Sequence, residues 1–398
     1  MPCALAHGAA AQRDSKPELA DIVRLHGGDV RRAQTLASVQ LRALRAIETC
    51  RTPALGGHRE TCDRCGASRS VYHSCRNRHC PKCQTLAKER WVEARSAELL
   101  PVPYFHLVFT LPHQLNRLAQ YRPRVIYNLL FEAAATTLQT FGRDPKHLGG
   151  EIGITAILHT WGQNLGQHIH LHCLVTGGAL ATDGAHWIPS HPRYLFPVRA
   201  LSPVFRAKFL AGLERALDKR LLSRADVDVD NLFSSLREKP WVVYAKRPFA
   251  GPESVIAYLG RYTHRIAISN NRIVDLRDGF VRFHWRDYKD ANRSKIMTLP
   301  AAEFLRRFLL HVLPRGFMRI RHFGLLANRH RKPKLERCRT LLRAAPPPTK
   351  PVESVASMVE RLTGKDPTLC PFCEQGTMRI TDRLAPGLTT TVPILDSS

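Results

Sequence analysis

Histidine alternates with other residues in the segment QHIHLHC, residues 167–173. The segment is rich in apolar residues and is predicted to form a strand. Successive side chains of a strand point to opposite faces, so His168, His170 and His172 share one face. Three imidazoles on one face can bind a divalent cation, and this spacing favours a metal site over three unrelated structural histidines.

Two tyrosines, Tyr258 and Tyr262, lie four residues apart in PESVIAYLGRYTHR, residues 252–265, which is predicted to be a helix. This spacing places both phenols on one helical face, one turn apart. A phenol with a pKa near 10 is a weak nucleophile unless a cation stabilises negative charge around it. Arg261, Arg265 and a metal-polarised phosphate would supply such stabilisation. The alternative is a pair of tyrosines that only pack together.

A third group of chemically active residues lies between positions 50 and 83. Two Cys-x-x-Cys pairs, Cys62/Cys65 and Cys80/Cys83, are separated by fourteen residues, which is close to the spacing of a zinc ribbon. We expect these four thiolates to bind one structural zinc ion, in place of a core too small to fold alone. Four further residues are candidates for a second zinc site, or else pack, hydrogen-bond or contact DNA: Cys50, His58, Cys75 and His79.

The composition points to a polyanionic partner. The 398 residues carry a formal net charge of +27, and residues 251–345 hold 21 Lys or Arg against 7 Asp or Glu. Such an excess favours nucleic acid over an acidic membrane surface. Aromatic residues interleave with this charge and suit stacking on unpaired bases, although some must be core residues: Phe280, Phe283, Trp285, Phe317 and Phe323.

The chain has neither a signal peptide nor an apolar run long enough to span a membrane, so we expect a cytoplasmic, nucleoid-associated protein with reduced cysteines. No Walker A sequence is present, and no nucleotide cofactor is expected. Periodicity predicts the following elements: helices over 35–50, 85–100, 123–142 and 203–222, strands over 104–111, 153–161, 168–178 and 241–247, and a hairpin over 272–288 that turns at Asp278-Gly279.

Three parts follow from these elements. Residues 1–100 form a helical and zinc-binding domain, 101–343 alternate strands and helices, and 344–398 hold a Pro-rich linker and a tail. The tail contains Cys370 and Cys373, which have no assigned role beyond a metal that would clip the tail.

In combination, these motifs resemble the HUH endonucleases, in which His-hydrophobic-His on a central strand precedes a helical Tyr-x-x-x-Tyr. The zinc cluster ahead of YFHLVFTLP is similar to that of the two-tyrosine transposases of rolling-circle insertion sequences. The resemblance extends from about residue 36 to 330 and includes LHTWGQNL, LVTGGAL, YLGRYTHRIAISNNRI and FLLHVLPRGFMRIRHFGLLA. Ile169 stands where the family usually has proline.

The resemblance implies an α+β fold, with an antiparallel sheet of about five strands, helices on its faces and the histidines on a central strand. It implies that His170 and His172 bind catalytic Mg²⁺ or Mn²⁺, while the third ligand stays open among His168, Gln163 and His159. It further implies that Tyr258 and Tyr262 attack single-stranded DNA at the ends of the element and form 5′-phosphotyrosine intermediates.

Two other functions stay open at this point. A replication initiator or relaxase would use the same chemistry at a different DNA site. A zinc-bearing DNA-binding regulator would use the histidines and tyrosines only for structure. The oligomeric state is not predicted.

Overall fold

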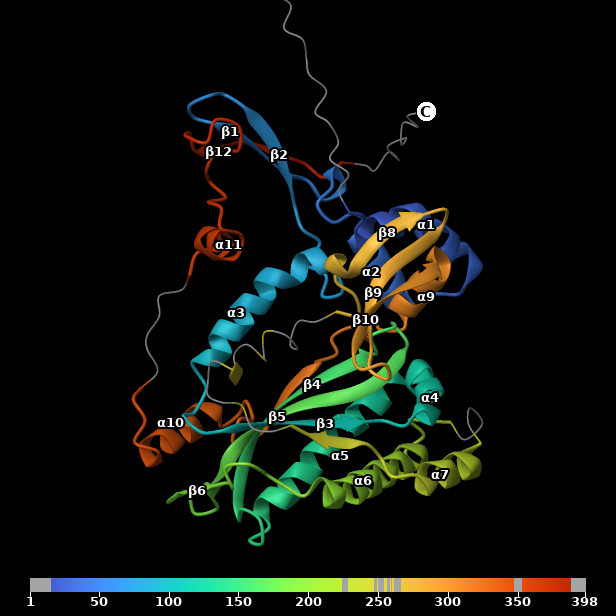
Figure 1. Ribbon diagram of the computed structural model, residues 1–398, viewed down its shortest axis with the longest axis vertical. Helices are drawn as coiled ribbons and strands as arrows, with labels where there is room; N and C mark the ends of the chain where they lie inside the picture. Colours follow the sequence, from blue (N-terminus) through green and yellow to red (C-terminus); the bar gives the residue numbers. More distant parts are fainter. Residues whose placement is uncertain are drawn as a thin grey trace, which may run out of the picture.

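An antiparallel sheet with the strand order β11-β4-β5-β3-β7 organises the larger part of the molecule (Figure 1). The computed structural model describes residues 16–223, 228–246, 249, 254–255, 258, 260, 266–346 and 353–387. The strands are β3 (Tyr104–Thr110), β4 (Gly150–Trp161), β5 (Gln167–Ala181), β7 (Val243–Ala245) and β11 (Ile320–Gly324), and the short β6 (Trp187–Pro189) pairs with β5. The α+β fold and the central position of the histidine strand are therefore confirmed.

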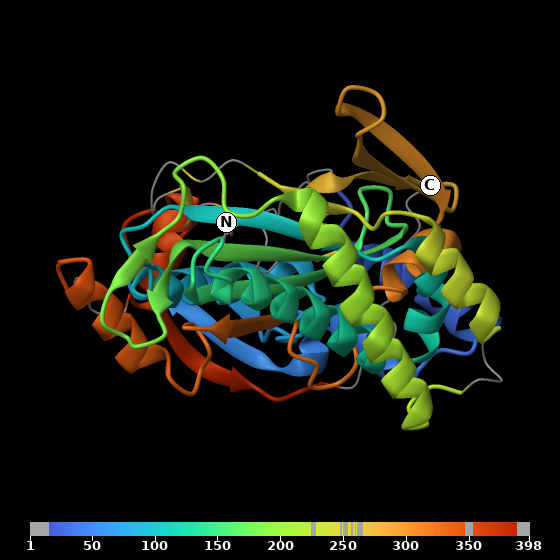
Figure 2. The ribbon, with the colours of Figure 1, turned by 90° about the horizontal axis from the view of Figure 1, so that it is seen from below.

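Helices cover one face of this sheet, as Figures 1 and 2 show for α5 and α6. They are α4 (Asn116–Tyr121), α5 (Pro123–Arg143), α6 (Val198–Asp218) and α7 (Val229–Glu238). Ile169, Leu171 and Cys173 of β5 are buried in the core that this layer forms with the sheet. The alternate residues of β5, which include the histidines, therefore lie on the opposite face.

A second antiparallel sheet, β10-β9-β8, packs against the N-terminal helices. It comprises β8 (Ile273–Arg277), β9 (Phe280–Asp287) and β10 (Arg293–Pro300) and shares a core with α1 (Leu19–Ala33), α2 (Ser38–Glu48) and α9 (Ala301–Leu309). Asp278 and Gly279 turn the predicted hairpin at φ values of 50° and 77°, a left-handed conformation that glycine adopts without strain.

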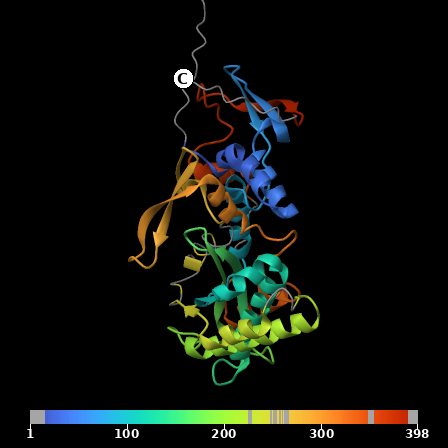
Figure 3. The ribbon, with the colours of Figure 1, turned by 90° about the vertical axis from the view of Figure 1, so that its right-hand side faces the viewer.

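The third sheet joins the two ends of the described chain. β12 (Met378–Leu384) pairs with β1 (Gly57–Cys62), and β1 pairs with β2 (Ser68–Tyr72), all antiparallel. Figure 3 shows β12 beside β1 and β2 at the top of the molecule. The segment predicted to be a separate C-terminal tail therefore contributes a strand to the N-terminal part.

The remaining described elements connect these parts. They are α3 (Gln84–Ser96), α10 (Arg331–Leu341), α11 (Val355–Thr363) and 3-10 turns at Pro53–Leu55, Pro81–Cys83, His113–Leu115 and Asn270–Arg272. Ser254, Val255, Tyr258 and Gly260 are helical, in agreement with the predicted tyrosine helix, whereas Tyr262 lies outside the described residues. None of the described helices is long and apolar enough to cross a membrane.

Candidate active site and metal centres

Three histidines converge on the sheet face opposite helices α5 and α6. Ring nitrogens of His159, His170 and His172 all lie within 4.8 Å of one another. His170 and His172 come from β5, and His159 is the direct partner of His170 on β4. The Nε2 atoms of His170 and His172 are 3.1 Å apart. Two nitrogens that bind one cation at about 2.1 Å and at right angles would be about 3.0 Å apart, so this geometry fits a shared divalent ion.

Hydrogen bonds on the outer side of the rings orient two of these imidazoles. Nδ1 of His170 lies 2.9 Å from the carbonyl oxygen of His168. A carbonyl only accepts, so Nδ1 donates and Nε2 keeps a lone pair for a metal. Nδ1 of His172 lies 2.9 Å from Nε2 of His106, which gives His172 the same orientation when it donates. Such outer contacts are typical of metal-binding histidines.

The third member of the cluster is His159, one of the open alternatives, rather than His168. His168 shares the predicted face and its ring centroid lies 4.6 Å from that of His170, but its ring nitrogens do not belong to the group in which all nitrogens lie within 4.8 Å of one another. Gln163, the other alternative, donates a hydrogen bond to the hydroxyl of Tyr288 at 3.1 Å. His159 lies directly across from His170 on the neighbouring strand β4, which brings its ring to the pair on β5.

His106 on β3 was not among the predicted site residues. Its ring is buried, and this burial lowers its pKa to about 3, so the imidazole is neutral and its Nε2 can accept from His172. The ring of Tyr258 packs against it, with centroids 4.6 Å apart. The alternation of β3 could have identified this residue, because Phe105, Leu107 and Phe109 enter the core and leave His106 on the histidine face.

Tyr258 is therefore next to the histidine cluster. Its side chain is 7% exposed and packs in a small cluster with Tyr104, Leu174 and Val255, and against Phe249. The contact runs from Tyr258 to His106 and from His106 to the proposed ligand His172. The structure thus brings the first predicted tyrosine and the predicted histidine pair to one face of the sheet.

The cysteines form two groups, and their membership differs from the predicted one. Cys50, Cys75, Cys80 and Cys83 make one group of four sulfurs, and Cys62, Cys65, Cys370 and Cys373 make the other. The prediction that both Cys-x-x-Cys pairs of residues 62–83 share one ion is wrong, because each pair faces different cysteines. The fourteen-residue spacing is compatible with a single ribbon, but β12 brings a more distant pair to Cys62 and Cys65.

The first group fits tetrahedral zinc. Sγ of Cys83 lies 3.6 Å from the sulfurs of both Cys50 and Cys75. Thiolates bound at about 2.3 Å in a tetrahedron are about 3.8 Å apart. Cys50 and Cys80 are buried at the edge of the core formed by α1, α2 and the β8–β10 sheet. An ion here would connect the loop after α2 to the start of α3.

The two histidines predicted for a second zinc site make other contacts. Nε2 of His58 lies 3.0 Å from a carboxylate oxygen of Glu60. Nε2 of His79 accepts a hydrogen bond from the backbone N–H of Leu313 at 3.2 Å, and burial lowers the pKa of His79 to about 3. Neighbouring Arg78 donates to the carbonyl of Pro314 at 2.8 Å. His79 and Arg78 therefore attach the cysteine loop to the segment after α9.

The outer face of β9 combines aromatic and basic side chains. Phe280 and Tyr288 are 46% and 70% exposed, and the exposed Arg282, His284 and Arg286 lie between them at alternate positions. The other face of the strand buries Val281 and Phe283. Of the aromatics predicted to meet DNA, Phe283 and Phe317 are core residues, whereas Phe280 is available.

Comparison with known proteins shows to which family this chain is similar. Residues 153–334 match the family described as "Putative transposase", and residues 22–111 match "Transposase zinc-binding domain". The "Putative transposase y4qJ" of Sinorhizobium fredii is 51% identical over 387 residues, which cover 94% of this chain and 97% of that protein. The "Transposase for insertion sequence element IS801" of Pseudomonas savastanoi pv. phaseolicola is 28% identical over 350 residues, 85% of this chain and 82% of that protein. No solved structure matches the chain.

Both family matches fall on the parts that carry the described site. The zinc-binding match includes Cys50, Cys75, Cys80 and Cys83, and the transposase match includes His159, His170, His172 and Tyr258. The comparisons favour a transposase over a regulator or a replication initiator. The chain belongs to the insertion-sequence transposases that join a zinc-binding domain to a two-tyrosine transposase domain, the family that its motifs resemble.

Proposed function

We propose that this transposase cleaves single-stranded DNA at the ends of its element and joins strands through a 5′-phosphotyrosine intermediate. The observation that carries the proposal is the contact series from Tyr258 through His106 to the cluster of His159, His170 and His172. It places a phenol next to a set of imidazoles suited to a divalent cation.

In this proposal, the phenol of a tyrosine releases its proton and its Oη attacks the scissile phosphorus. The new P–O bond to tyrosine forms while the bond to the 3′ oxygen breaks, and that oxygen leaves as a 3′-hydroxyl after taking a proton. One phosphodiester bond replaces another, so the reverse attack by a 3′-hydroxyl rejoins DNA without ATP. A divalent cation at the histidine cluster would withdraw charge from the phosphate.

Neighbouring residues orient the proposed metal ligands and the proposed nucleophile. The carbonyl of His168 orients the ring of His170, and the ring of His106 orients that of His172. Their Nε2 atoms lie 3.1 Å apart, close enough to bind the same cation. The ring of Tyr258 packs on that of His106. We propose Tyr262 as the second nucleophile, one helical turn from Tyr258 in the predicted helix, so that a second end can be cut while the first is held.

The donor set also bears on the choice of cation. Imidazole is a softer ligand than carboxylate, and Mn²⁺ binds nitrogen ligands more readily than Mg²⁺ does. We therefore propose that Mn²⁺ supports cleavage better than Mg²⁺ at equal concentration. Zinc is proposed for the group of Cys50, Cys75, Cys80 and Cys83, where four thiolates leave no open position and the role is structural.

A covalent-capture experiment tests the proposal. Single-stranded DNA of the element's own end, labelled at its 3′ terminus, is incubated with the full chain and Mn²⁺. The tyrosine keeps the 5′-phosphate side, so the label should enter a protease-sensitive complex that resists SDS. Tyr258→Phe and Tyr262→Phe remove one attacking oxygen each, and the double variant should give no labelled protein.

Tyr104→Phe is the matched control, because Tyr104 shares the packed cluster of Tyr258 and its hydroxyl accepts from the N–H of Leu100 at 3.0 Å. It should retain the adduct. Labelled protein from the double tyrosine variant would contradict the proposal, as would a label that enters protein from the 5′ terminus instead.

A further inference from the structure

Cys62, Cys65, Cys370 and Cys373 form a four-sulfur group built from opposite ends of the chain. Sγ of Cys62 lies 3.8 Å from that of Cys373, and Sγ of Cys65 lies 3.7 Å from that of Cys370. A disulfide would need about 2.05 Å. Thiolates of a tetrahedral zinc site are about 3.8 Å apart, which is the separation found here.

Backbone amides donate hydrogen bonds to three of these sulfurs, in both Cys-x-x-Cys turns. The N–H groups of Arg64 and Cys65 each donate to Sγ of Cys62 at 3.4 Å. The N–H of Phe372 donates to Sγ of Cys370, and that of Gly376 to Sγ of Cys373, both at 3.4 Å. Such donors stabilise negative charge on sulfur, so the turns favour thiolates, the form that binds metal.

Gly376 provides an independent sign that the two turns are fitted to each other. A Cβ at this position would clash with the sulfur of Cys62 and would approach Cβ of Arg64. Gly376 thus leaves room for the backbone of the C-terminal turn beside a sulfur of the N-terminal turn. A glycine at such a close approach is expected where the four sulfurs must share one centre.

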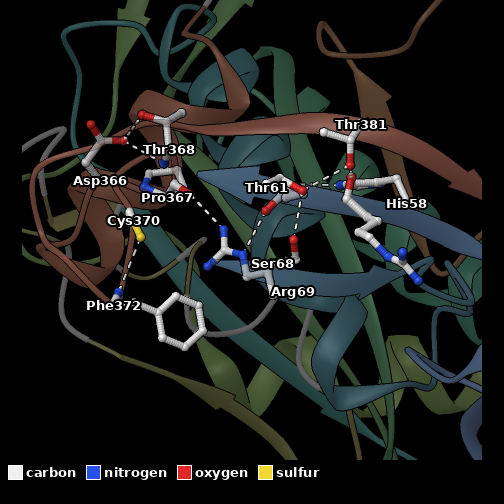
Figure 4. A network of polar contacts seen from close by, with 12 residues as sticks. His58, Thr61, Ser68, Arg69, Asp366, Pro367, Thr368, Cys370, Phe372 and Thr381 are labelled. Atoms are coloured by element: carbon white, nitrogen blue, oxygen red, sulfur yellow. Dashed lines mark hydrogen bonds and ion pairs between the residues drawn. The ribbon is translucent and has the colours of Figure 1, made fainter. Parts of the chain in front are cut away.

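Polar contacts join the β1–β2 hairpin to the C-terminal segment that contains β12, as Figure 4 shows for several of them. Arg69 donates to the carbonyl of Pro367 at 3.1 Å, and the hydroxyls of Thr61 and Thr381 are 3.2 Å apart. Asp63 accepts from the N–H of Thr377 at 2.8 Å and pairs with Arg379 at 3.1 Å. These contacts set the register in which β12 pairs with β1.

The apolar core of this sheet is too small to hold it together. The buried members are Cys62, Cys370 and Met378, with Cys373 packed against them. Burial of these few side chains stabilises the sheet by less than the backbone entropy that is lost when the residues of three strands become ordered. A bound metal is the usual source of stability for modules with so little core.

We infer that Cys62, Cys65, Cys370 and Cys373 bind a second structural zinc ion, which fastens the C-terminal segment to the β1–β2 hairpin. This site is separate from the group of Cys50, Cys75, Cys80 and Cys83 and does not depend on the proposed DNA cleavage. The full chain therefore binds two zinc ions through thiolates, one at each group.

Cobalt substitution of the full chain tests the inference, because thiolate-to-cobalt charge-transfer absorption counts thiolate sites and is absent for a histidine-only site. Cys370→Ser/Cys373→Ser should lose half of the wild-type absorption and retain the other half. Cys50→Ser/Cys75→Ser should lose the complementary half. Cys338→Ala is the matched control, since Cys338 is buried in α10 outside both groups, and it should keep full absorption.

A second measurement separates loss of the ion from general misfolding. Gly376→Ala keeps every thiol and should lower cobalt affinity at one site at least tenfold, while hydrogen exchange accelerates within residues 368–384 and not in α5. Full absorption in Cys370→Ser/Cys373→Ser would overturn the inference. So would a thiol titration of denatured, unreduced protein that finds four fewer than the eleven cysteines, because disulfides would then join the pairs.

Discussion

Nε2 of His106 on β3 lies 2.9 Å from Nδ1 of His172 on β5, so a buried imidazole of one strand orients the proposed metal ligand on the next. His172 is 7% exposed and His106 is 1% exposed, which leaves little room for either ring to adopt another orientation. We therefore propose His106 as a positioning residue that acts through His172, and its ring also packs on that of Tyr258.

Replacing His106 with alanine should reduce DNA cleavage by about 10- to 100-fold. Loss of a hydrogen-bond partner of a metal-binding histidine typically lowers metal affinity or activity by that factor. Most of the loss should be recovered at high Mn²⁺ concentration. His106→Gln keeps an acceptor near Nδ1 of His172 and should recover part of the activity. Cleavage rates over a Mn²⁺ titration provide the measurement. A loss that no Mn²⁺ concentration restores would indicate that His106 acts in another way.

His159→Ala should abolish cleavage, and His168→Ala should leave it within a few-fold of wild type. The ring nitrogen of His159 belongs to the three-histidine group, whereas His168 contributes its backbone carbonyl to His170, which alanine retains. Isothermal titration with Mn²⁺ and a nicking assay should give the same ranking. The opposite ranking would return the third ligand to His168.

The outer face of β9 should contact single-stranded DNA. Phe280→Ala should weaken that binding roughly tenfold, since stacking of one base on an aromatic ring contributes about 1–3 kcal/mol. Arg286→Ala should reduce the slope of log affinity against log salt by about one. Fluorescence anisotropy with single-stranded and duplex forms of one sequence is the measurement. Tyr121→Ala, which alters an aromatic 65% exposed on α4, is the control and should bind as wild type does.

Acid should destabilise the fold through His311. Its Nε2 donates to the carbonyl of Leu165 at 2.9 Å, its Nδ1 lies 3.2 Å from the hydroxyl of Thr160, and burial lowers its pKa to about 4. In the unfolded chain the pKa is near 6.5, so between pH 6.5 and 4 the unfolded state binds a proton that the folded state does not. The free energy of unfolding therefore falls as the pH drops through this window, by up to about 3 kcal/mol from this residue.

His311→Gln should flatten the pH dependence of the urea midpoint over that window. The variant loses some stability at neutral pH, so the comparison concerns the slope rather than the absolute value. His330→Gln changes an exposed histidine and serves as the control, with an unchanged slope. Equal slopes for wild type and His311→Gln would contradict the assignment.

The local elements were predictable because their signals are contained in short segments. The strand β5 follows from alternating histidines and apolar residues, and the hairpin turn follows from Asp278-Gly279. The same alternation placed His168 on the correct face but could not give its distance from the cluster. His168 and His172 each lie two residues from His170 along β5, so the alternation treats them alike, yet only His172 belongs to the three-histidine group. Only the register of β4 on β5 brings His159 to His170.

The cysteine grouping was not predictable for a similar reason. Each Cys-x-x-Cys turn presents the same half-site, and its spacing does not specify which other half-site it meets. Pairing of β1 with β12 decides that question, and the residues in contact, such as Asp63 and Thr377, are 314 positions apart. His106 was missed because a single histidine in an otherwise apolar strand resembles an ordinary core residue.

The pairing of β1 with β12 also has a consequence for biosynthesis. When β1 leaves the ribosome, its partner strand has not yet been translated, and the edge of β1 stays open until β12, about 320 residues later, has been made. Open strand edges invite aggregation and proteolysis. A chain truncated between residues 173 and 369 would therefore keep the three clustered histidines but carry an N-terminal module that lacks β12 and two of its four clustered thiols.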